Sequence, residues 1–160
     1  MKRREAREIA LCLLFDYSFN KEEDTDEIMN LYLKNIPEKG KSVPASEIKD
    51  DPYISTVFYG AVSKADELDS YIEKAAQNWK PERISRISRA ILRLAIFEML
   101  YMDDIPVRVS ANEAVELAKT FDHENGYSFV NGILGNVVAS LGIAGAGETT
   151  TEKEAYEENV

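Results

Sequence analysis

Apolar residues recur at intervals of three and four along nearly the whole chain, and this spacing constrains the fold more than any other feature. Such a period places them on one face of an α-helix, whereas a half-buried strand would alternate apolar and polar residues. In the region 3–19, for example, Ala6, Ala10, Leu13 and Tyr17 share one face. No convincing run of alternation is present. The sequence therefore predicts an all-α bundle of about seven helices joined mostly by short loops.

Proline, glycine and charged residues mark the breaks between the expected helices. Asp51 and Pro52 suit an N-cap and a first helical position. Ser110 and Glu113 have the spacing of a capping box, in which the two side chains bond each other's backbone N–H groups. The segment 37–52 is the longest predicted loop. The expected helices cover approximately 3–19, 24–35, 52–78, 84–102, 110–121 and 129–142.

The chain has 160 residues, enough for one domain or for two small subdomains that share a core. We expect one helical domain over 1–143, with subdomains of about 1–78 and 79–143 that meet at the Trp-Lys-Pro break. Residues 144–160 are rich in Gly, Thr and Glu and have little apolar periodicity. This composition predicts a disordered acidic tail.

The charge is unevenly distributed along the chain. The formal net charge is −10, which argues against a general nucleic-acid binder because such proteins usually present a basic field. Residues 1–9 nevertheless carry +2, since four cations outnumber two glutamates there. The segments 21–27 and 148–160 carry −4 each. The sequence therefore predicts a basic patch at the start of an otherwise acidic molecule.

Composition also excludes several classes of protein. No stretch of 18 consecutive apolar residues is present, so we expect no membrane span. The N-terminus lacks the small-residue cleavage site of a secretory signal. The single Cys12 cannot form an internal disulfide and suits a reducing cytosol, so we expect a cytoplasmic protein. One cysteine and one histidine, His123, are too few for a structural zinc site.

No motif in the sequence supports catalysis. There is no Gly-rich phosphate loop, no Ser/His/Asp order and no nucleophile motif, and His123 falls in a polar loop. Gly132 and Gly135 lie inside the last expected helix, where glycine is unfavourable, and the close approach of another helix would explain them. No strand precedes them, as a dinucleotide-binding fingerprint requires. We therefore predict no enzyme activity, no cofactor and no metal.

A basic cluster opens the first expected helix. Arg3 and Arg7 are four residues apart and Arg4 and Arg7 three apart, so these side chains share a face with Lys2 close by. Several cations could then meet successive phosphates of a nucleic acid. The alternative is a plain solvated terminus, whose charge the two nearby glutamates reduce.

A second arginine set follows one side of the helix expected over 84–102. These side chains could bind phosphate, or they could be partly buried and pair with carboxylates such as Glu98 or Glu113. We favour pairing for the last two members. The set comprises Arg83, Arg86, Arg89 and Arg93.

Four stretches, by their order and spacing over about residues 2–142, resemble the NusB family. The specific feature is an NEAVELAK segment with eleven residues between it and NGILG, after an ILRLA helix and an Ile-Pro turn. The four stretches are KRREAREIALCLLF, RISRAILRLAIFEM, IPVRVSANEAVELAKTF and FVNGILG.

The resemblance implies a fold of two three-helix subdomains, packed about perpendicular, with the N-terminal helix at their junction. It also implies a function without catalysis or a cofactor. NusB-like proteins bind the boxA element of nascent ribosomal RNA leaders as a heterodimer with NusE, a small-subunit ribosomal protein. The complex joins RNA polymerase and suppresses premature termination.

The resemblance further assigns RNA contacts to positions of this chain. Phe15 stands where the family commonly has Tyr, so a hydroxyl is lost while stacking is kept. Ser88 replaces an acidic residue that often precedes the arginine of the fifth helix. Phe121 and Phe129 also suit the pattern of core residues. The implied RNA contacts are Lys2, Arg3, Arg4, Arg7, Phe15, Phe121, Asn125 and Phe129.

Two other functions are compatible with the sequence. NusB-like helical domains also precede the catalytic domain of some rRNA cytosine methyltransferases, although no cofactor-binding segment follows the helical part here. The second alternative is a helical dimerisation module, in which the basic N-terminus is simply solvated. A homodimer that hides the first helix is a further expectation to test.

Overall fold

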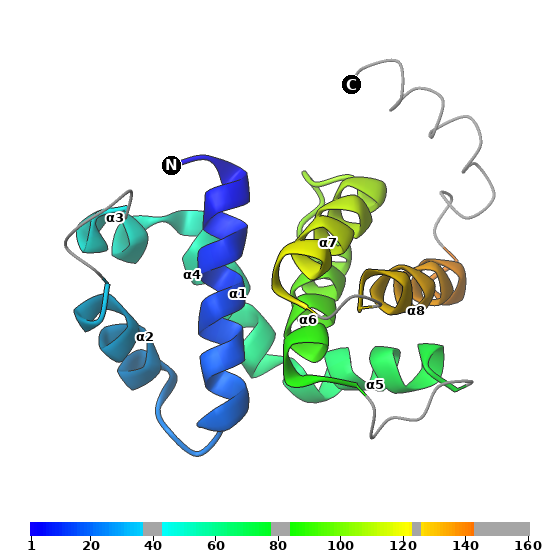
Figure 1. The fold of residues 1–160 in the computed structure, drawn as a ribbon, viewed down its shortest axis with the longest axis horizontal. Helices are drawn as coiled ribbons and strands as arrows, with labels where there is room; N and C mark the ends of the chain where they lie inside the picture. The colour runs from blue at the N-terminus through cyan, green and yellow to red at the C-terminus, as the bar shows by residue number, and fades with distance from the viewer. Residues whose placement is uncertain (37–42, 78–83, 123–125, 143–160) are drawn as a thin grey trace.

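A computed structural model describes residues 1–36, 43–77, 84–122 and 126–142 (Figure 1). Within these ranges the chain forms eight helices and no strand, which confirms the predicted all-α class. None of the helices found there is long and apolar enough to span a bilayer. The helices are α1 (Arg3–Phe19), α2 (Thr25–Lys34), α3 (Ala45–Asp50), α4 (Pro52–Ser63), α5 (Ala65–Ala75), α6 (Arg86–Tyr101), α7 (Val107–Phe121) and α8 (Gly126–Ser140).

Helix α6 is central and packs against α1, α4, α5, α7 and α8. Figure 1 shows α1 beside α6, with α2 and α3 beyond α1 on one side and α8 beyond α6 on the other, while α7 packs against both α6 and α8. Helix α1 therefore lies between the two ends of the bundle and can present side chains toward both. The expected subdomain boundary near residue 78 and the tail 144–160 lie outside the described residues, and the division into subdomains stays a prediction.

The burial of α6 explains its position. Every residue from Ala90 to Met99 is buried, including Arg93 and Glu98. A helix that is apolar nearly all round is stable only when other elements cover it on all sides. The two charged residues must then find partners inside the fold, because an unpaired buried charge is very costly.

Helices α4 and α6 approach closely at Gly60. A Cβ atom at this position would overlap the ring of Phe97, so only glycine leaves room for the contact. The sequence instead predicts a close approach of helices at Gly132 and Gly135. That prediction is wrong for Gly135, where an added Cβ would meet no atom within 4 Å.

The helices differ from the predicted ones in four places, and one of these is the start of α8, which begins at Gly126, three residues before the predicted start at 129. The expected long helix breaks at Lys64, and the apolar spacing continues in phase across the break, so periodicity cannot reveal it. A short helix, α3, lies in the predicted loop and buries Ile48. Helix α7 begins after Pro106, so Ser110 lies inside the helix and the predicted capping box is wrong. The Ser110 hydroxyl donates instead to a buried carboxylate.

Candidate nucleic-acid interface

Helix α1 carries three arginines in its first two turns, close to the positive end of its own dipole. Cations are unfavourable at that end, where unpaired N–H groups already give a partial positive charge. Within the helix, the Glu5 carboxylate accepts a hydrogen bond from the backbone N–H of Lys2, 3.2 Å away. Carboxylates from α6 and α7 supply the other negative charges.

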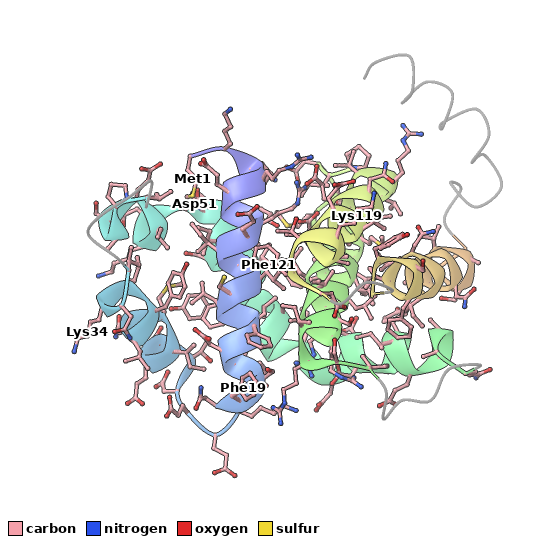
Figure 2. All side chains as sticks on the ribbon, viewed as in Figure 1. Met1, Phe19, Lys34, Asp51, Lys119 and Phe121 are labelled. Carbon is pink, nitrogen blue, oxygen red and sulfur yellow. The ribbon has the colours of Figure 1, made fainter. Side chains whose placement is uncertain are left out.

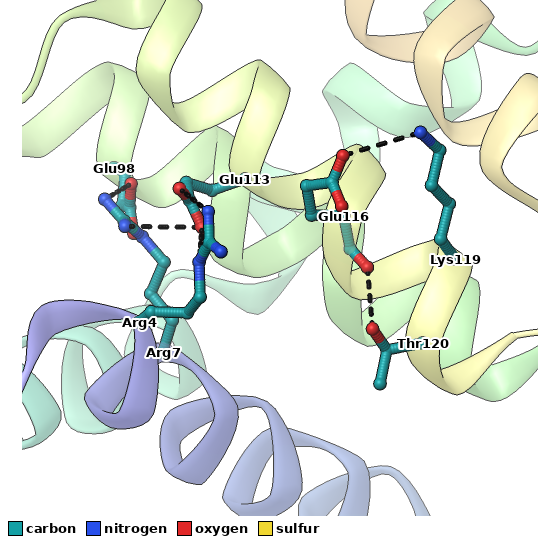
Figure 3. Close-up of polar contacts among 7 residues, drawn as sticks. All are labelled: Arg4, Arg7, Glu98, Glu113, Glu116, Lys119 and Thr120. Carbon is teal, nitrogen blue, oxygen red and sulfur yellow. Dashed lines mark hydrogen bonds and ion pairs between the residues drawn. The ribbon is translucent and has the colours of Figure 1, made fainter. Parts of the chain in front are cut away.

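Arg7 is an internal anchor of α1, with only 4% of the residue exposed. Its guanidinium donates two hydrogen bonds to Glu98, at 2.8 Å from Nε to Oε2 and 3.2 Å from Nη2 to Oε1 (Figure 3). Glu98 is fully buried and also accepts hydrogen bonds from the hydroxyls of Tyr53 and Ser110. Burial alone would lower the pKa of Arg7, but the hydrogen bonds and charge of Glu98 outweigh it and raise that pKa.

Arg3 lies outside the buried group that Glu98 forms with Arg7, Tyr53 and Ser110. Its Cζ atom is 4.5 Å from the centroid of the Tyr53 ring, a distance at which the ring face attracts a cation. Burial, followed by the charge of Glu98, raises the pKa of Tyr53, so its hydroxyl stays a donor. Arg3 and Lys2 are exposed, and neither forms an ion pair with a described residue.

Arg4 points toward α7, where it meets Glu113 in a two-bond contact (Figure 3). The shorter bond, from Nη2 to Oε1, is 2.9 Å, and 65% of the Arg4 side chain remains exposed. Glu113 also lies 3.9 Å from Nη1 of Arg7. Its hydrogen bond and its charge raise the pKa of Arg4. Glu113 therefore links α7 to the arginines of α1. It does not form the capping box that the sequence predicts.

An aromatic cavity of about 530 Å³ lies farther along α1, near its C-terminal end. Phe15 and Phe19 meet there edge to face, with ring centroids 5.0 Å apart. Phe121 lines the cavity from the end of α7 and is 40% exposed, and Phe19 is 56% exposed. Figure 2 labels both residues, one at the end of α7 and the other at the end of α1. The Arg86 guanidinium lies 4.4 Å from the Phe19 centroid and donates to the backbone carbonyl of Ser18 at 2.8 Å.

A carboxylate stands beside this cavity although the chain has Ser88 on α6, where the family resemblance expects an acidic residue. The Ser88 hydroxyl donates a hydrogen bond to Asp122, the residue that caps the C-terminus of α7. Ser85, which lines the cavity, also donates to Asp122 at 3.5 Å. The negative charge beside the cavity therefore comes from the C-cap of α7, whereas the family resemblance places it on α6.

The predicted contact residues fall into two groups on α1 and the elements beside it. The cations gather at its start, and Phe15 and Phe121 line the same cavity. Arg4 and Phe15 are eleven residues apart on one side of the helix, which corresponds to about 16 Å. Phe129 is half-buried against the core. Asn125 lies outside the described residues.

Phe19 and Arg86 also line the cavity, although neither is among the predicted RNA contacts. Phe19 follows Phe15 by four residues, and this spacing on an amphipathic helix could have identified it. Arg86 belongs to the second arginine set, but only the fold shows that it lies against α1. Together with Phe121 these residues form a surface that can hold a planar ring next to a cation. Among the described residues, no group of three or more His, Cys, Asp or Glu could hold a metal ion.

Two other members of the second arginine set pair with a partly buried carboxylate, which is the kind of contact that the sequence predicts. Arg93 donates two hydrogen bonds of 2.8 Å each to Asp69 on α5, and Arg89 lies 3.4 Å from the same carboxylate. The predicted partners, Glu98 and Glu113, are wrong, because α1 approaches α6 and α7 and its arginines occupy both carboxylates.

Comparison with known proteins places this geometry in a family. The model of the NusB family matches residues 4–139. The transcription antitermination protein NusB of Clostridium acetobutylicum is 42% identical over 140 residues, covering 88% of this chain and 97% of that protein. The NusB protein of Bacillus subtilis is 41% identical over 141 residues, covering 88% of this chain and 98% of that protein.

Solved structures with the same arrangement of helices include NusB of T. maritima, with a TM-score of 0.67 and 31% identity, covering 86% of this chain and 90% of that chain. A chain in the structure of antitermination factors NusB and NusE in complex with dsRNA has a TM-score of 0.67 and 25% identity. This match covers 86% of our chain and 96% of that one. The family model spans most of the described helices, and the relatives match nearly end to end, so the chain belongs to the NusB family.

Proposed function

We propose that this protein is a transcription antitermination factor that binds the boxA RNA of nascent rRNA transcripts together with NusE, in a complex with RNA polymerase. It acts by binding and catalyses no reaction. The observation that carries the proposal is the shared side of α1, where Arg4 and Phe15 lie in line. A single RNA strand along this side meets cations first and aromatic rings next, the two kinds of group that hold single-stranded RNA.

Lys2, Arg3 and Arg4 are the cations we assign to phosphates, because all three are exposed. Arg7 is buried against Glu98, so we assign it the role of positioning α1. Each phosphate neutralised on a single strand contributes about −0.7 to the slope of log affinity against log salt. Three contacts then predict a slope of about −2.

The aromatic cavity is the part of the surface we assign to bases. A base that enters it can stack on Phe15, Phe19 or Phe121, with Arg86 at its edge. Each stacked base contributes about 1–3 kcal/mol as judged by alanine substitution. This stacking does not need the hydroxyl that Phe15 lacks relative to the usual tyrosine.

NusE supplies the rest of the affinity in this proposal. The similar structure that contains NusB, NusE and dsRNA supports such a complex for this chain. Two proteins that hold one RNA raise the effective concentration of each for the other. We place this activity in the cytoplasm, where the transcripts are made.

The test is fluorescence anisotropy of a boxA RNA with and without NusE, over a range of salt concentrations. The double variant R3A/R4A should weaken binding and reduce the magnitude of the salt slope by about 1.4. The matched control K34A/K49A removes two exposed lysines from α2 and α3 and should leave the slope unchanged. Equal slopes for the two variants would refute the assignment. A protein that sediments as a dimer and ignores RNA would favour a dimerisation module instead.

A further inference from the structure

A second groove, of about 830 Å³, lies on the α2 side of α1. Helices α1, α2 and α3 form most of its walls, and Figure 1 shows α2 and α3 on the side of α1 away from α6. Phe121, at the end of α7, lines both this groove and the aromatic cavity, so the two adjoin there. The groove walls are largely apolar and include Ile9, Ile28, Tyr32 and Ile48. Leu31, also in the wall, is 56% exposed, although leucines of this kind usually cover a core. The groove therefore offers an apolar surface that the described part of the chain does not cover.

Carboxylates surround this apolar surface. Glu5, Glu8 and Asp16 follow one stripe of α1 along the groove, and Glu23 joins them from the turn before α2. No lysine or arginine is among the described residues that line it. Glu8, Asp16 and Glu23 form no ion pair with any described residue. Partial burial raises the pKa of Asp16, and a cation entering the groove would offset this unfavourable burial.

From the apolar walls and from carboxylates that no described cation pairs, we infer that this groove binds a basic, amphipathic segment of a partner protein. Apolar side chains of the segment would lie against Ile9 and Leu31, and its lysines or arginines would pair with Glu8, Asp16 and Glu23. Such recognition follows the general pattern of an amphipathic helix in an apolar groove. The occupant is a different class of partner from RNA, whose phosphates these carboxylates repel.

Two segments of this chain are poor occupants. Residues 148–160 carry −4 and would be repelled by the same carboxylates. Much of the basic N-terminus of a second copy is held within its own fold, and of its cations Lys2 and Arg3 alone form no ion pair with a described residue. Its terminal ammonium lies 2.8 Å from Glu47, Arg4 pairs with Glu113 and Arg7 with Glu98. A separate protein with free basic residues therefore fits the groove better.

The experiment uses the full chain and a fluorescein-labelled amphipathic peptide of leucine and lysine, about four helical turns long. Anisotropy should detect binding of this peptide and no binding of the same peptide with glutamate in place of lysine. The variant E8K/E23K should weaken binding about tenfold or more, since two attractions become repulsions. The control D66K/E73K makes the same charge change on exposed residues of α5 and should alter binding less than about threefold.

A second variant, L31S, tests the apolar part of the contact. It should weaken peptide binding severalfold and leave boxA RNA binding unchanged. Circular dichroism confirms that each variant is folded. Equal losses in E8K/E23K and D66K/E73K would show a diffuse electrostatic effect and overturn the proposal. So would an unchanged affinity in L31S. A dimer in sedimentation that L31S dissociates would assign the groove to a second copy and overturn it as well.

Discussion

Replacing Glu98 with Gln should destabilise the protein by about 3–5 kcal/mol, because Arg7 would keep a buried charge that has lost its hydrogen-bonded counter-ion and retains only the longer 3.9 Å contact with Glu113. The Glu98 side chain is fully buried and that of Arg7 is 5% exposed, so water cannot take over the lost interaction. Each oxygen of Glu98 accepts two hydrogen bonds, Oε1 from Arg7 and Ser110 and Oε2 from Arg7 and Tyr53. An amide has one acceptor oxygen, so two of these four donors would face its NH₂ group.

Urea unfolding followed by far-UV circular dichroism measures this loss. A change in the midpoint with a constant m value would report stability alone. The loss is a large part of the 5–15 kcal/mol that a domain usually has. For a chain of this size it corresponds to a fall in Tm of about 6–20 °C.

Glu116 provides the matched control, because it forms a surface ion pair that Figure 3 shows beside the buried one. It lies 3.4 Å from Lys119, and both side chains are about half exposed. E116Q should therefore change stability by less than about 0.5 kcal/mol. The double variant R7M/E98Q removes the uncompensated charge and should cost at least about 2 kcal/mol less than the sum of its single variants. Additive single variants, or an E98Q as stable as E116Q, would refute the reasoning.

Three further outcomes follow from other parts of the fold. Burial tends to raise the pKa of Asp69, but the hydrogen bonds and charge of Arg93 lower it below its usual value. The ionised Asp69 therefore stabilises the fold above the unfolded pKa of about 3.9, and this stabilisation is lost as the pH falls through the folded pKa. D69N should accordingly flatten the acid limb of a curve of stability against pH. Gly60→Ala should cost about 1–3 kcal/mol in urea unfolding, because its Cβ would displace Phe97, whereas Gly135→Ala should not destabilise. Burial raises the pKa of the Cys12 thiol, so its labelling by a disulfide reagent at neutral pH should be slower than in urea-unfolded protein, and equal rates would contradict this burial.

The helices were predictable where an apolar stripe faces one direction, and their interruptions were not. Helix α1 ends at Phe19, as its spacing predicts. The break at Lys64 leaves that spacing in phase, so it is invisible to a pattern with a period of 3.6. Ser110 has the spacing of a capping box, yet the preceding Pro106 already starts the helix, and the serine hydroxyl serves Glu98.

The nature of the site residues was predictable, and their partners were not. Arginines on an apolar helix need carboxylates, and this expectation is correct for Arg93. Its partner, Asp69, is 24 residues away on another helix, while Glu98 pairs with Arg7 from 91 residues earlier. Such pairings depend on which helices meet, and residue spacing within one helix carries no information about that.

The rotation of α1 explains how a chain of net charge −10 could offer the RNA surface that we propose. Successive helical residues turn by about 100°, so Arg4 and Phe15 share one stripe while Glu5 and Asp16 share another about 100° away. The local +2 of residues 1–9 still overstates the attraction, because Arg7 is neutralised by Glu98 and Arg4 is partly neutralised by Glu113. Few cations then act freely, so RNA binding by this chain alone should be weak. Its selectivity must depend on where the rings and cations lie and on the partner that holds the same RNA.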